Sequence, residues 1–204
     1  MISKEFRIVM DKLTGNTERT SRILRESLAV WEYVHRKIGR GRYWQITKDE
    51  VRVLYSLIAA RRPKVVIETG MGPGVSTTSI LSGLKGSGKL ISIDPGEPYG
   101  KGDRDIGFVI PEELKKDLIY VKGRTSDKLN EVLEKTGMVD FFFHDSDHSY
   151  ENVIFELETV FPYLSSNYLI VIDNYNWSDA PAHFAKNHGL RLLHIADDMA
   201  LITE

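Results

Sequence analysis

The order of apolar and polar positions divides the chain into a helical N-terminal part and a longer part in which strands and helices alternate. Apolar residues recur at helical spacing from residue 21 to residue 38, and the sequence GRG at residues 39–41 predicts the end of that helix. The sequence TKDE at residues 47–50 matches a capping box and predicts that a second helix begins there. Residues 1–20 predict only a short helix or a loose arm, because residues 14–16 form a turn signal.

After Pro63 the pattern changes to short apolar runs that alternate with amphipathic segments. Strands are predicted at residues 65–67, 90–93, 118–121, 140–143 and 169–172, and helices at residues 76–84, 111–116, 126–135, 150–163 and 182–187. Residues 190–195 and 199–203 predict a terminal antiparallel hairpin. The repeated strand-helix unit indicates an α/β fold with a doubly wound, mostly parallel sheet of seven strands, whose last strand is antiparallel. We expect residues 1–62 to form a helical cap and residues 63–204 to form the main domain.

Composition limits the classes of protein that fit this pattern. The chain has 204 residues, of which 42% are hydrophobic and 27% are charged, as is typical of a folded domain. It has no cysteine, so any metal ligand must be an oxygen or an imidazole nitrogen. No run of about eighteen apolar residues occurs, and the N-terminus lacks the apolar core of a signal peptide, so we expect a cytoplasmic protein without a membrane partner.

Charge is distributed unevenly along the chain. Residues 1–42 hold ten Lys and Arg against five Asp and Glu, although the formal net charge of the whole chain is −2. The basic residues alternate with apolar ones at helical spacing, which favours the solvated face of an amphipathic helix over a nucleic-acid contact. Nucleic acid is therefore disfavoured as a partner, and the helical arm offers a surface on which a homo-oligomer could form.

A glycine-rich loop follows the first predicted strand. Gly70, Gly72 and Gly74 occupy alternate positions at the strand end where doubly wound sheets bind their ligands. The dinucleotide fingerprint requires a glycine where Val75 stands, and no lysine follows the loop as a P-loop requires. The loop thus disfavours pyrophosphates and nucleoside triphosphates, and a tight turn without a ligand is the structural alternative.

Two acidic residues frame this loop. Glu68 ends the first strand, and Asp94 ends the second strand, where a carboxylate can accept hydrogen bonds from ribose hydroxyls. Asp94 would also suit NAD, but Glu68 places a negative charge beside the loop. That charge favours a cationic ligand, and S-adenosylmethionine is such a ligand.

The loop and its acids carry a specific family resemblance. VVIETGMGPGVST at residues 65–77, followed by ISID at residues 91–94, resembles the first two motifs of class I S-adenosylmethionine-dependent methyltransferases, whose sheet is Rossmann-like. The likeness spans residues 43–204. It implies S-adenosylmethionine as the cofactor, with its methionine part near Glu68 and the glycines, its ribose on Asp94 and its adenine beside residues 125–126. The cofactor-binding residues implied in this way are Glu68, Gly70, Gly72, Ser76, Asp94, Thr125, Ser126 and Asp145. For Ser126, a helix N-cap is the alternative.

Polar clusters follow the fourth and fifth predicted strands, at the same edge of the sheet as the glycine loop. Asp145, Asp173 and Asn174 supply three oxygen ligands there, and such a set suits Mg²⁺ or another divalent cation. The set resembles the metal site of small O-methyltransferases of the catechol type. DSDHSY at residues 145–150 resembles bacterial relatives that include proteins named cephalosporin hydroxylases, with Ser146 in place of their glycine.

Each residue of these clusters also has a structural explanation. Asp145 and Asp147 can cap the following helix, and Asp173 and Asn174 can be ordinary turn residues. His148 stands where the bacterial group has a histidine, and we predict that it is the general base, with a metal ligand or a helix start as alternatives. Asp145 and Asp147 should raise its pKa, and a bound cation should oppose them. His144 is expected to be structural.

Together these features predict an enzyme that transfers a methyl group from S-adenosylmethionine to a metal-chelated hydroxyl of a small-molecule acceptor. An oxidoreductase of the NAD type and a noncatalytic cofactor-binding module are the alternatives, and the acceptor cannot be identified from the sequence. Residues 42–46 (RYWQI) resemble the stretch that lies against the methionine end of the cofactor, although Trp44 can equally be a core aromatic. Residues 95–110, with several glycines and a proline at position 98, are typical of a lid.

Overall fold

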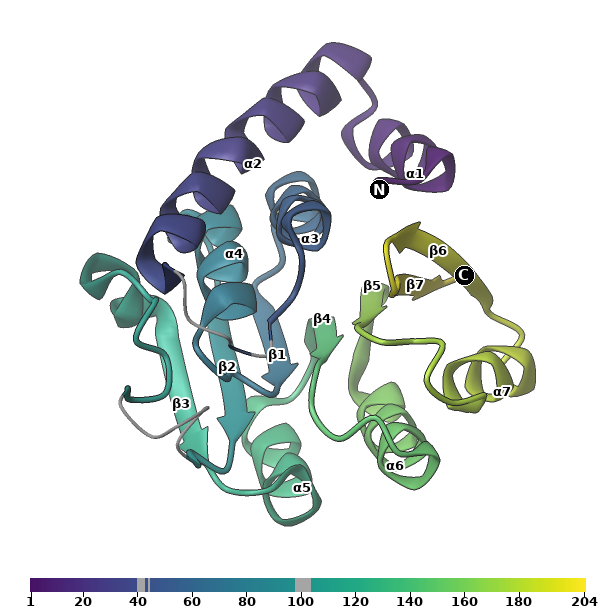
Figure 1. Ribbon diagram of the computed structural model, residues 1–204. Helices are drawn as coiled ribbons and strands as arrows, with labels where there is room; N and C mark the ends of the chain where they lie inside the picture. The colour runs from purple at the N-terminus through teal and green to yellow at the C-terminus, as the bar shows by residue number, and fades with distance from the viewer. Residues whose placement is uncertain (40–42, 44, 98–103) are drawn as a thin grey trace.

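The computed structural model describes residues 1–39, 43, 45–97 and 104–204, and its centre is a seven-stranded sheet with helices on both faces (Figure 1). The strands are β1 (Val65–Thr69), β2 (Lys89–Asp94), β3 (Leu118–Lys122), β4 (Val139–His144), β5 (Leu164–Ile172), β6 (Arg191–Ala196) and β7 (Met199–Thr203). They lie in the order β3-β2-β1-β4-β5-β7-β6, with β1 to β5 parallel and β7 antiparallel to both of its neighbours. The predicted doubly wound, mostly parallel sheet with its terminal antiparallel hairpin is therefore confirmed.

Helices cover the sheet in two layers, which Figure 1 shows above and below it. One layer holds α1 (Lys4–Thr14), α2 (Thr17–Ile38), α3 (Lys48–Arg61) and α4 (Val75–Leu84). The other holds α5 (Thr125–Thr136), α6 (Tyr150–Val160) and α7 (Ala180–Asn187). Short 3₁₀ helices, η1 (Glu112–Asp117) and η2 (Phe161–Tyr163), precede β3 and β5.

The central strands are buried because they pack against both layers. In β4, Phe141 and Phe143 point into the core beneath α1 to α4, whereas Phe142 points into the core beneath α5 to α7. All three side chains are fully buried. A strand that is covered on both faces has a continuous apolar sequence, which explains why the sequence pattern predicts β4.

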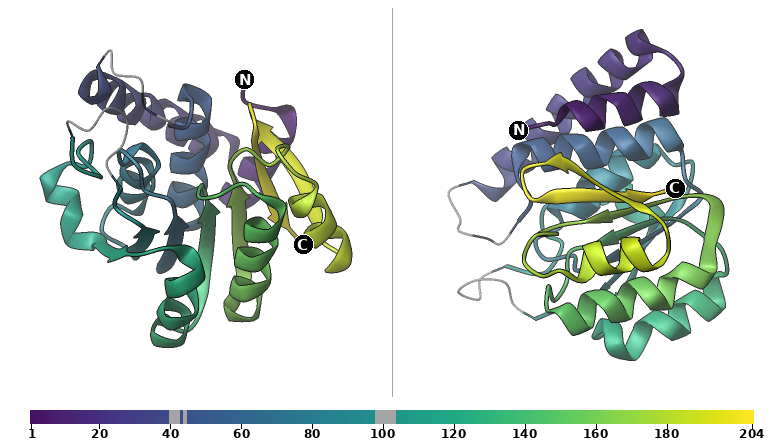
Figure 2. Two further views of the ribbon diagram at one scale, coloured as in Figure 1. Left: turned by 60° about the horizontal axis from the view of Figure 1, so that its bottom comes forward. Right: turned by 90° about the vertical axis from the view of Figure 1, so that its right-hand side faces the viewer.

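The predicted end signals mark the end of α2 and the start of α3. The capping box of α3 is present: Glu50 Oε2 accepts from the Thr47 amide at 2.7 Å, and the Thr47 hydroxyl accepts from the Glu50 amide. Helix α2 begins at Thr17, earlier than predicted, because Asn16 caps it by accepting from the Arg19 amide at 2.9 Å. Helix α1 packs against α3 and β6 (Figure 2). Ile2, which precedes α1, pairs with Ala196 of β6.

Two predicted elements differ from the structure. Residues 111–116 were expected to form an α-helix, but the segment forms the 3₁₀ helix η1. Strand β5 begins at Leu164 instead of Leu169. The pairing of β5 with β4 shifts register between Val139 and Phe141. Residues 165–167, near the start of β5, are polar and partly exposed, so they lack the apolar pattern that marks the buried half of the strand.

Two predicted segments lie partly outside the described residues. These are the segment at residues 42–46, of which Arg42 and Trp44 are not described, and the predicted lid, of which residues 98–103 are not described. In the described remainder of that loop, the Gly107 amide donates to the Gly72 carbonyl at 2.9 Å and the Val109 amide to the Pro73 carbonyl at 3.0 Å, so residues 107–109 lie against the glycine loop. Among the helices that the structure describes, none combines the length and the apolar character that a membrane span requires.

Candidate functional site

Two neighbouring cavities lie at the edge of the sheet where the parallel strands end. The acidic cavity, of about 300 Å³, lies between the glycine loop, the start of α3 and the ends of β4 and β5, and carries Glu50, Asp145, Asp173 and Asp198 on its wall. The wide cavity, of about 910 Å³, lies between the ends of β2 and β4 and the start of α5. Gly70, Asp145 and Ser146 line both cavities, so the two cavities lie side by side. Both volumes fall in the range of small-molecule sites.

The conformation of the glycine loop requires glycine at two of its positions. Gly70 and Gly74 have positive φ angles of 87° and 92°. A Cβ atom on Gly70 would lie 1.9 Å from the Asp145 carbonyl oxygen, because the end of β1 passes directly against the end of β4. This close approach places the glycine loop and the polar cluster after β4 side by side.

Asp94 holds the glycine loop from the end of β2. Its Oδ2 accepts from the Met71 amide at 2.8 Å and the Gly72 amide at 3.1 Å, and its Oδ1 accepts from the Gly96 amide at 2.7 Å. Asp94 also lines the wide cavity, so it is placed where the prediction of a ribose contact requires it. The ribose contact itself stays a prediction.

Thr125 and Ser126 line the same cavity at the start of α5. The N-cap of α5 is Arg124, and no side chain caps this helix, so Ser126 does not have the capping role that was its alternative. Its hydroxyl donates to Asp127 at 3.1 Å. The Ser126 hydroxyl is thus not used as a helix cap, and the contact of Thr125 and Ser126 with adenine stays a prediction.

Glu68 lies beneath the loop and does not face either cavity. Its carboxylate is fully buried and accepts from the hydroxyls of Ser76 at 2.7 Å, Thr77 at 2.8 Å and Ser92 at 2.7 Å. Burial raises the pKa of Glu68 to about 7, although the three hydroxyls oppose this shift. Glu68 is not among the described residues that line the cavities, whereas Ser76 lines the acidic one. Any effect of Glu68 on a cofactor would therefore pass through Ser76.

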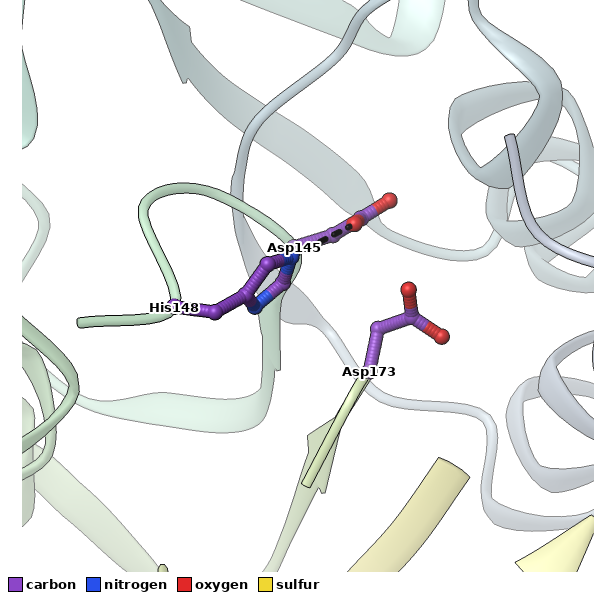
Figure 3. Close-up of side chains that lie close together, drawn as sticks. All are labelled: Asp145, His148 and Asp173. Carbon is purple, nitrogen blue, oxygen red and sulfur yellow. Dashed lines mark ion pairs between the residues drawn. The ribbon is translucent and has the colours of Figure 1, made fainter. Parts of the chain in front are cut away.

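Three residues that were predicted to be metal ligands or the general base lie close together in the acidic cavity. Asp145 follows β4, His148 precedes α6, and Asp173 follows β5, and one ligand atom from each lies within 4.8 Å of the others (Figure 3). The His148 Nε2 atom is 3.9 Å from Asp145 Oδ1. Asn174, with a positive φ of 51°, donates its amide nitrogen to Asp173 Oδ2 at 2.9 Å and to His148 Nε2 at 3.1 Å. The predicted metal set and the predicted base are thus adjacent.

Burial dominates the electrostatics of this cluster. Burial and then the charge of Asp173 raise the pKa of Asp145, and burial followed by the charge of Asp198 raises the pKa of Asp173 to about 7. Burial and the neighbouring His144 lower the pKa of His148 to about 4. The sequence led us to expect that nearby acids would raise the pKa of His148, but its desolvation is the larger effect. His148 is therefore neutral at physiological pH.

The donor set fits a divalent cation. Asp173 is 6% exposed, and its Oδ1 atom is buried without a hydrogen-bond partner. A buried carboxylate oxygen without a partner is unfavourable unless a proton or a cation satisfies it. Oxygen ligands from Asp145 and Asp173, with the imidazole of His148 beside them, match the ligands of divalent cations in proteins.

A buried network that the sequence did not reveal supports the loop after β4. Glu156 of α6 accepts from the Thr69 hydroxyl at 2.6 Å and the Ser146 hydroxyl at 2.6 Å, and it pairs with His144 Nδ1 at 2.7 Å. Glu156 and His144 are fully buried. Burial opposes ionisation of Glu156, but His144 and the hydroxyls keep the pKa of Glu156 below its usual value. His144 thus has the structural surroundings expected of it, and the network fixes the position of Ser146.

Glu50 and Asp198 are further residues that the sequence did not indicate as part of the site. Glu50 is recognisable only as a capping residue, yet it is 1% exposed and lines the acidic cavity. Its Oε1 accepts from the Asp198 amide at 3.2 Å, which joins the start of α3 to the β6-β7 hairpin. Burial, followed by Asp198 and Asp173, raises the pKa of Glu50 to about 8.

Comparison with known proteins places the chain among methyltransferases. Residues 67–175, more than half of the chain, match the family described as "Methyltransferase domain". No curated protein sequence gives a significant match.

Solved structures share the fold at low identity. An O-methyltransferase from Bacillus cereus in complex with SAH is 17% identical, with a TM-score of 0.61 over 90% of this chain and 91% of that chain. A putative O-methyltransferase from Klebsiella pneumoniae is 19% identical, with a TM-score of 0.61 over 88% of each chain. The O-methyltransferase TomG from Streptomyces achromogenes, in complex with SAM, is 14% identical, with a TM-score of 0.61 over 88% and 90%. At these identities the likeness establishes the fold.

Proposed function

The chain belongs to the methyltransferase-domain family, and on this premise we propose that it transfers a methyl group from S-adenosylmethionine to a hydroxyl oxygen of a small acceptor held at a divalent cation. One observation carries this proposal. A wide cavity and an acidic cavity meet at Gly70, Asp145 and Ser146, so a cofactor in the first can present its methyl group to an acceptor in the second. Holding both reactants in line is a large part of the catalysis of such a transfer.

The cofactor would lie along the edge of the sheet. Asp94 would accept from the ribose, and Thr125 and Ser126 would border the adenine in the wide cavity. The methionine part would then follow the glycine loop towards the acidic cavity, which Gly72 and Ser76 also line. The sulfonium charge would be favoured there by the carboxylates on the wall of that cavity.

Asp145 and Asp173 would hold the cation, with His148 beside them. A bound divalent cation would lower the pKa of the acceptor hydroxyl and orient its oxygen. Asn174 now directs its amide nitrogen at Asp173 and His148, and an amide nitrogen cannot be a cation ligand. Turning the amide by half a rotation would direct its oxygen into the cavity, as the predicted ligand role requires, and would free His148 Nε2.

His148 would take the proton that the acceptor loses. Its Nε2 atom accepts from Asn174, so the neutral ring carries its hydrogen on Nδ1 and has a lone pair on Nε2. In the transfer, His148 Nε2 would accept the proton of the acceptor hydroxyl. S-adenosylmethionine would supply the methyl group, so the products would be a methyl ether, S-adenosylhomocysteine and a protonated imidazole.

The test uses S-adenosylmethionine labelled in its methyl group and a panel of catechols, sugars and other vicinal diols. We expect label in an acceptor with Mg²⁺, none with EDTA, and recovery when Mg²⁺ is restored. Asp173→Ala should abolish the transfer, whereas Asp179→Ala, which removes an exposed carboxylate at the start of α7, should leave it unchanged.

Other outcomes would contradict specific parts of the proposal. Full transfer in the presence of EDTA, or by Asp173→Ala, would show that the cluster is structural. S-adenosylhomocysteine binding without transfer to any acceptor would favour a noncatalytic module. A melting temperature raised by NAD and not by S-adenosylhomocysteine would favour an oxidoreductase.

A further inference from the structure

A second group of carboxylates shares the acidic cavity with the cation site described above. Glu50, Asp173 and Asp198 each offer one oxygen, and these oxygens lie within 4.8 Å of one another. They come from the first turn of α3, the end of β5 and the β6-β7 hairpin. The amide of Asp198 donates to Glu50, and its carbonyl accepts from the Tyr175 amide at 3.0 Å, so the backbone fixes the geometry of this group.

Asp173 belongs to both groups and has an oxygen that no protein atom satisfies. Its Oδ2 accepts from Asn174, whereas its Oδ1 is buried without a hydrogen-bond partner. Asp173 is 6% exposed, so a bound proton, water molecule or cation has to provide the missing interaction. Asp173 is the residue that both groups share, and a carboxylate can bridge two cations through its two oxygens.

The lining and the size of the cavity suit cations. Four carboxylates, those of Glu50, Asp145, Asp173 and Asp198, line the cavity, and no Lys or Arg is among its described lining residues. A bound cation would stabilise the ionised form of these carboxylates, which burial alone disfavours. The volume of about 300 Å³ corresponds to about ten water molecules, so it has room for two hydrated ions.

We propose that the acidic cavity binds a second divalent cation between Glu50, Asp173 and Asp198, with Asp173 as the bridge to the first cation. The two ions would be about 3.5 to 4 Å apart, as in other two-metal sites. The second ion would join the start of α3 to the β6-β7 hairpin. This inference extends the proposed cation site, but it does not depend on the chemistry that the site performs.

The experiment counts Mn²⁺ ions bound per chain by electron paramagnetic resonance, with the full chain and no cofactor. The wild type should bind two ions and show the spin coupling of a close pair. Asp198→Asn and Glu50→Gln should each bind one ion and lose the coupling. Both changes preserve shape, and glutamine is an accepted capping-box residue, so Glu50→Gln keeps the acceptor for the Thr47 amide.

The matched control is Asp49→Asn, which removes the neighbouring carboxylate in the same turn of α3. Asp49 pairs with Arg52 and is outside both groups, so this variant should still bind two coupled ions. Melting temperatures of all variants show whether each is folded.

The inference is overturned if the wild type binds one Mn²⁺, or if Asp198→Asn and Glu50→Gln both still bind two coupled ions. One ion in the wild type would mean that a shared proton, not a metal, satisfies Glu50 and Asp198. The count is independent of turnover. Two coupled ions in a protein that transfers no methyl group would therefore support this inference and contradict the proposed function.

Discussion

Replacing Glu68 by glutamine should remove a large pH dependence from the stability of the protein. In the folded protein, burial raises the pKa of Glu68 to about 7 from an ordinary value of 4.5. The folded state therefore keeps this proton at pH values at which the unfolded chain has lost it. The stabilising effect of the proton is complete below pH 4.5 and is lost as the pH rises to about 7.

The size of the effect follows from the gap between the two pKa values. The gap is about 2.5 pKa units, and each unit corresponds to about 1.4 kcal/mol, so Glu68 should lower the free energy of unfolding by about 3 kcal/mol between pH 4.5 and pH 7. Because the side chain is fully buried, solvent screening does not reduce this figure. The glutamine variant has no such titration.

Glutamine can keep the hydrogen bonds of the glutamate. Its amide oxygen can accept from Thr77 and Ser92, which both donate to Oε2 of Glu68, and its amide nitrogen can donate to Ser76 once that hydroxyl turns. The substitution therefore removes the charge with little change in packing. Titrating groups that do not interact with Glu68 contribute equally to both proteins, so they cancel in the difference.

The assay is urea unfolding of the wild type and Glu68→Gln at intervals from pH 4 to pH 8. Glu134→Gln, which changes an exposed residue of α5, serves as the control and should follow the wild type. The stability of Glu68→Gln relative to the wild type should rise by about 3 kcal/mol from pH 4.5 to pH 7 and then stay constant. Parallel curves over this range would refute the reasoning, because they would mean that Glu68 ionises normally.

Three further predictions concern single residues of the site. Asp94→Ala should weaken S-adenosylhomocysteine binding at least tenfold, about 1.4 kcal/mol by calorimetry, because the ribose acceptor and three amide contacts of the loop are lost; unchanged affinity would contradict the assignment. His148→Ala should lower kcat by about 10² to 10⁴ with unchanged cofactor affinity, and an undiminished kcat would exclude it as the base. Gly70→Ala should lower the free energy of unfolding by at least about 2 kcal/mol in urea, because its Cβ would overlap the Asp145 carbonyl; unaltered stability would show that the two strand ends can separate.

The sequence predicts those elements whose residues carry a local signal. The capping box at Thr47 and Glu50 locates the start of α3, and the apolar run of Phe141 to Phe143 locates β4, because both patterns follow from neighbouring residues. The start of β5 and the 3₁₀ geometry of η1 depend on register and packing against other segments. A sequence pattern does not contain that information.

The same distinction applies to the site. Asp145 and Asp173 are predictable neighbours, since both follow adjacent parallel strands. Glu50 and Asp198 come from a helix cap and a hairpin turn, and Glu156 lies inside a helix, so nothing local indicates that they reach the same edge of the sheet. Their clustering depends on three tertiary contacts that only the folded chain establishes.

The contact between Gly70 and Asp145 has a thermodynamic consequence for the two ligands of the site. Asp145 lines both cavities, and its carboxylate belongs to the proposed cation site. A cation that immobilises Asp145 would also order one wall of the wide cavity, so the cofactor would bind to a better-defined surface. Linkage requires this coupling to be reciprocal: the factor by which Mg²⁺ tightens S-adenosylmethionine binding must equal the factor by which S-adenosylmethionine tightens Mg²⁺ binding.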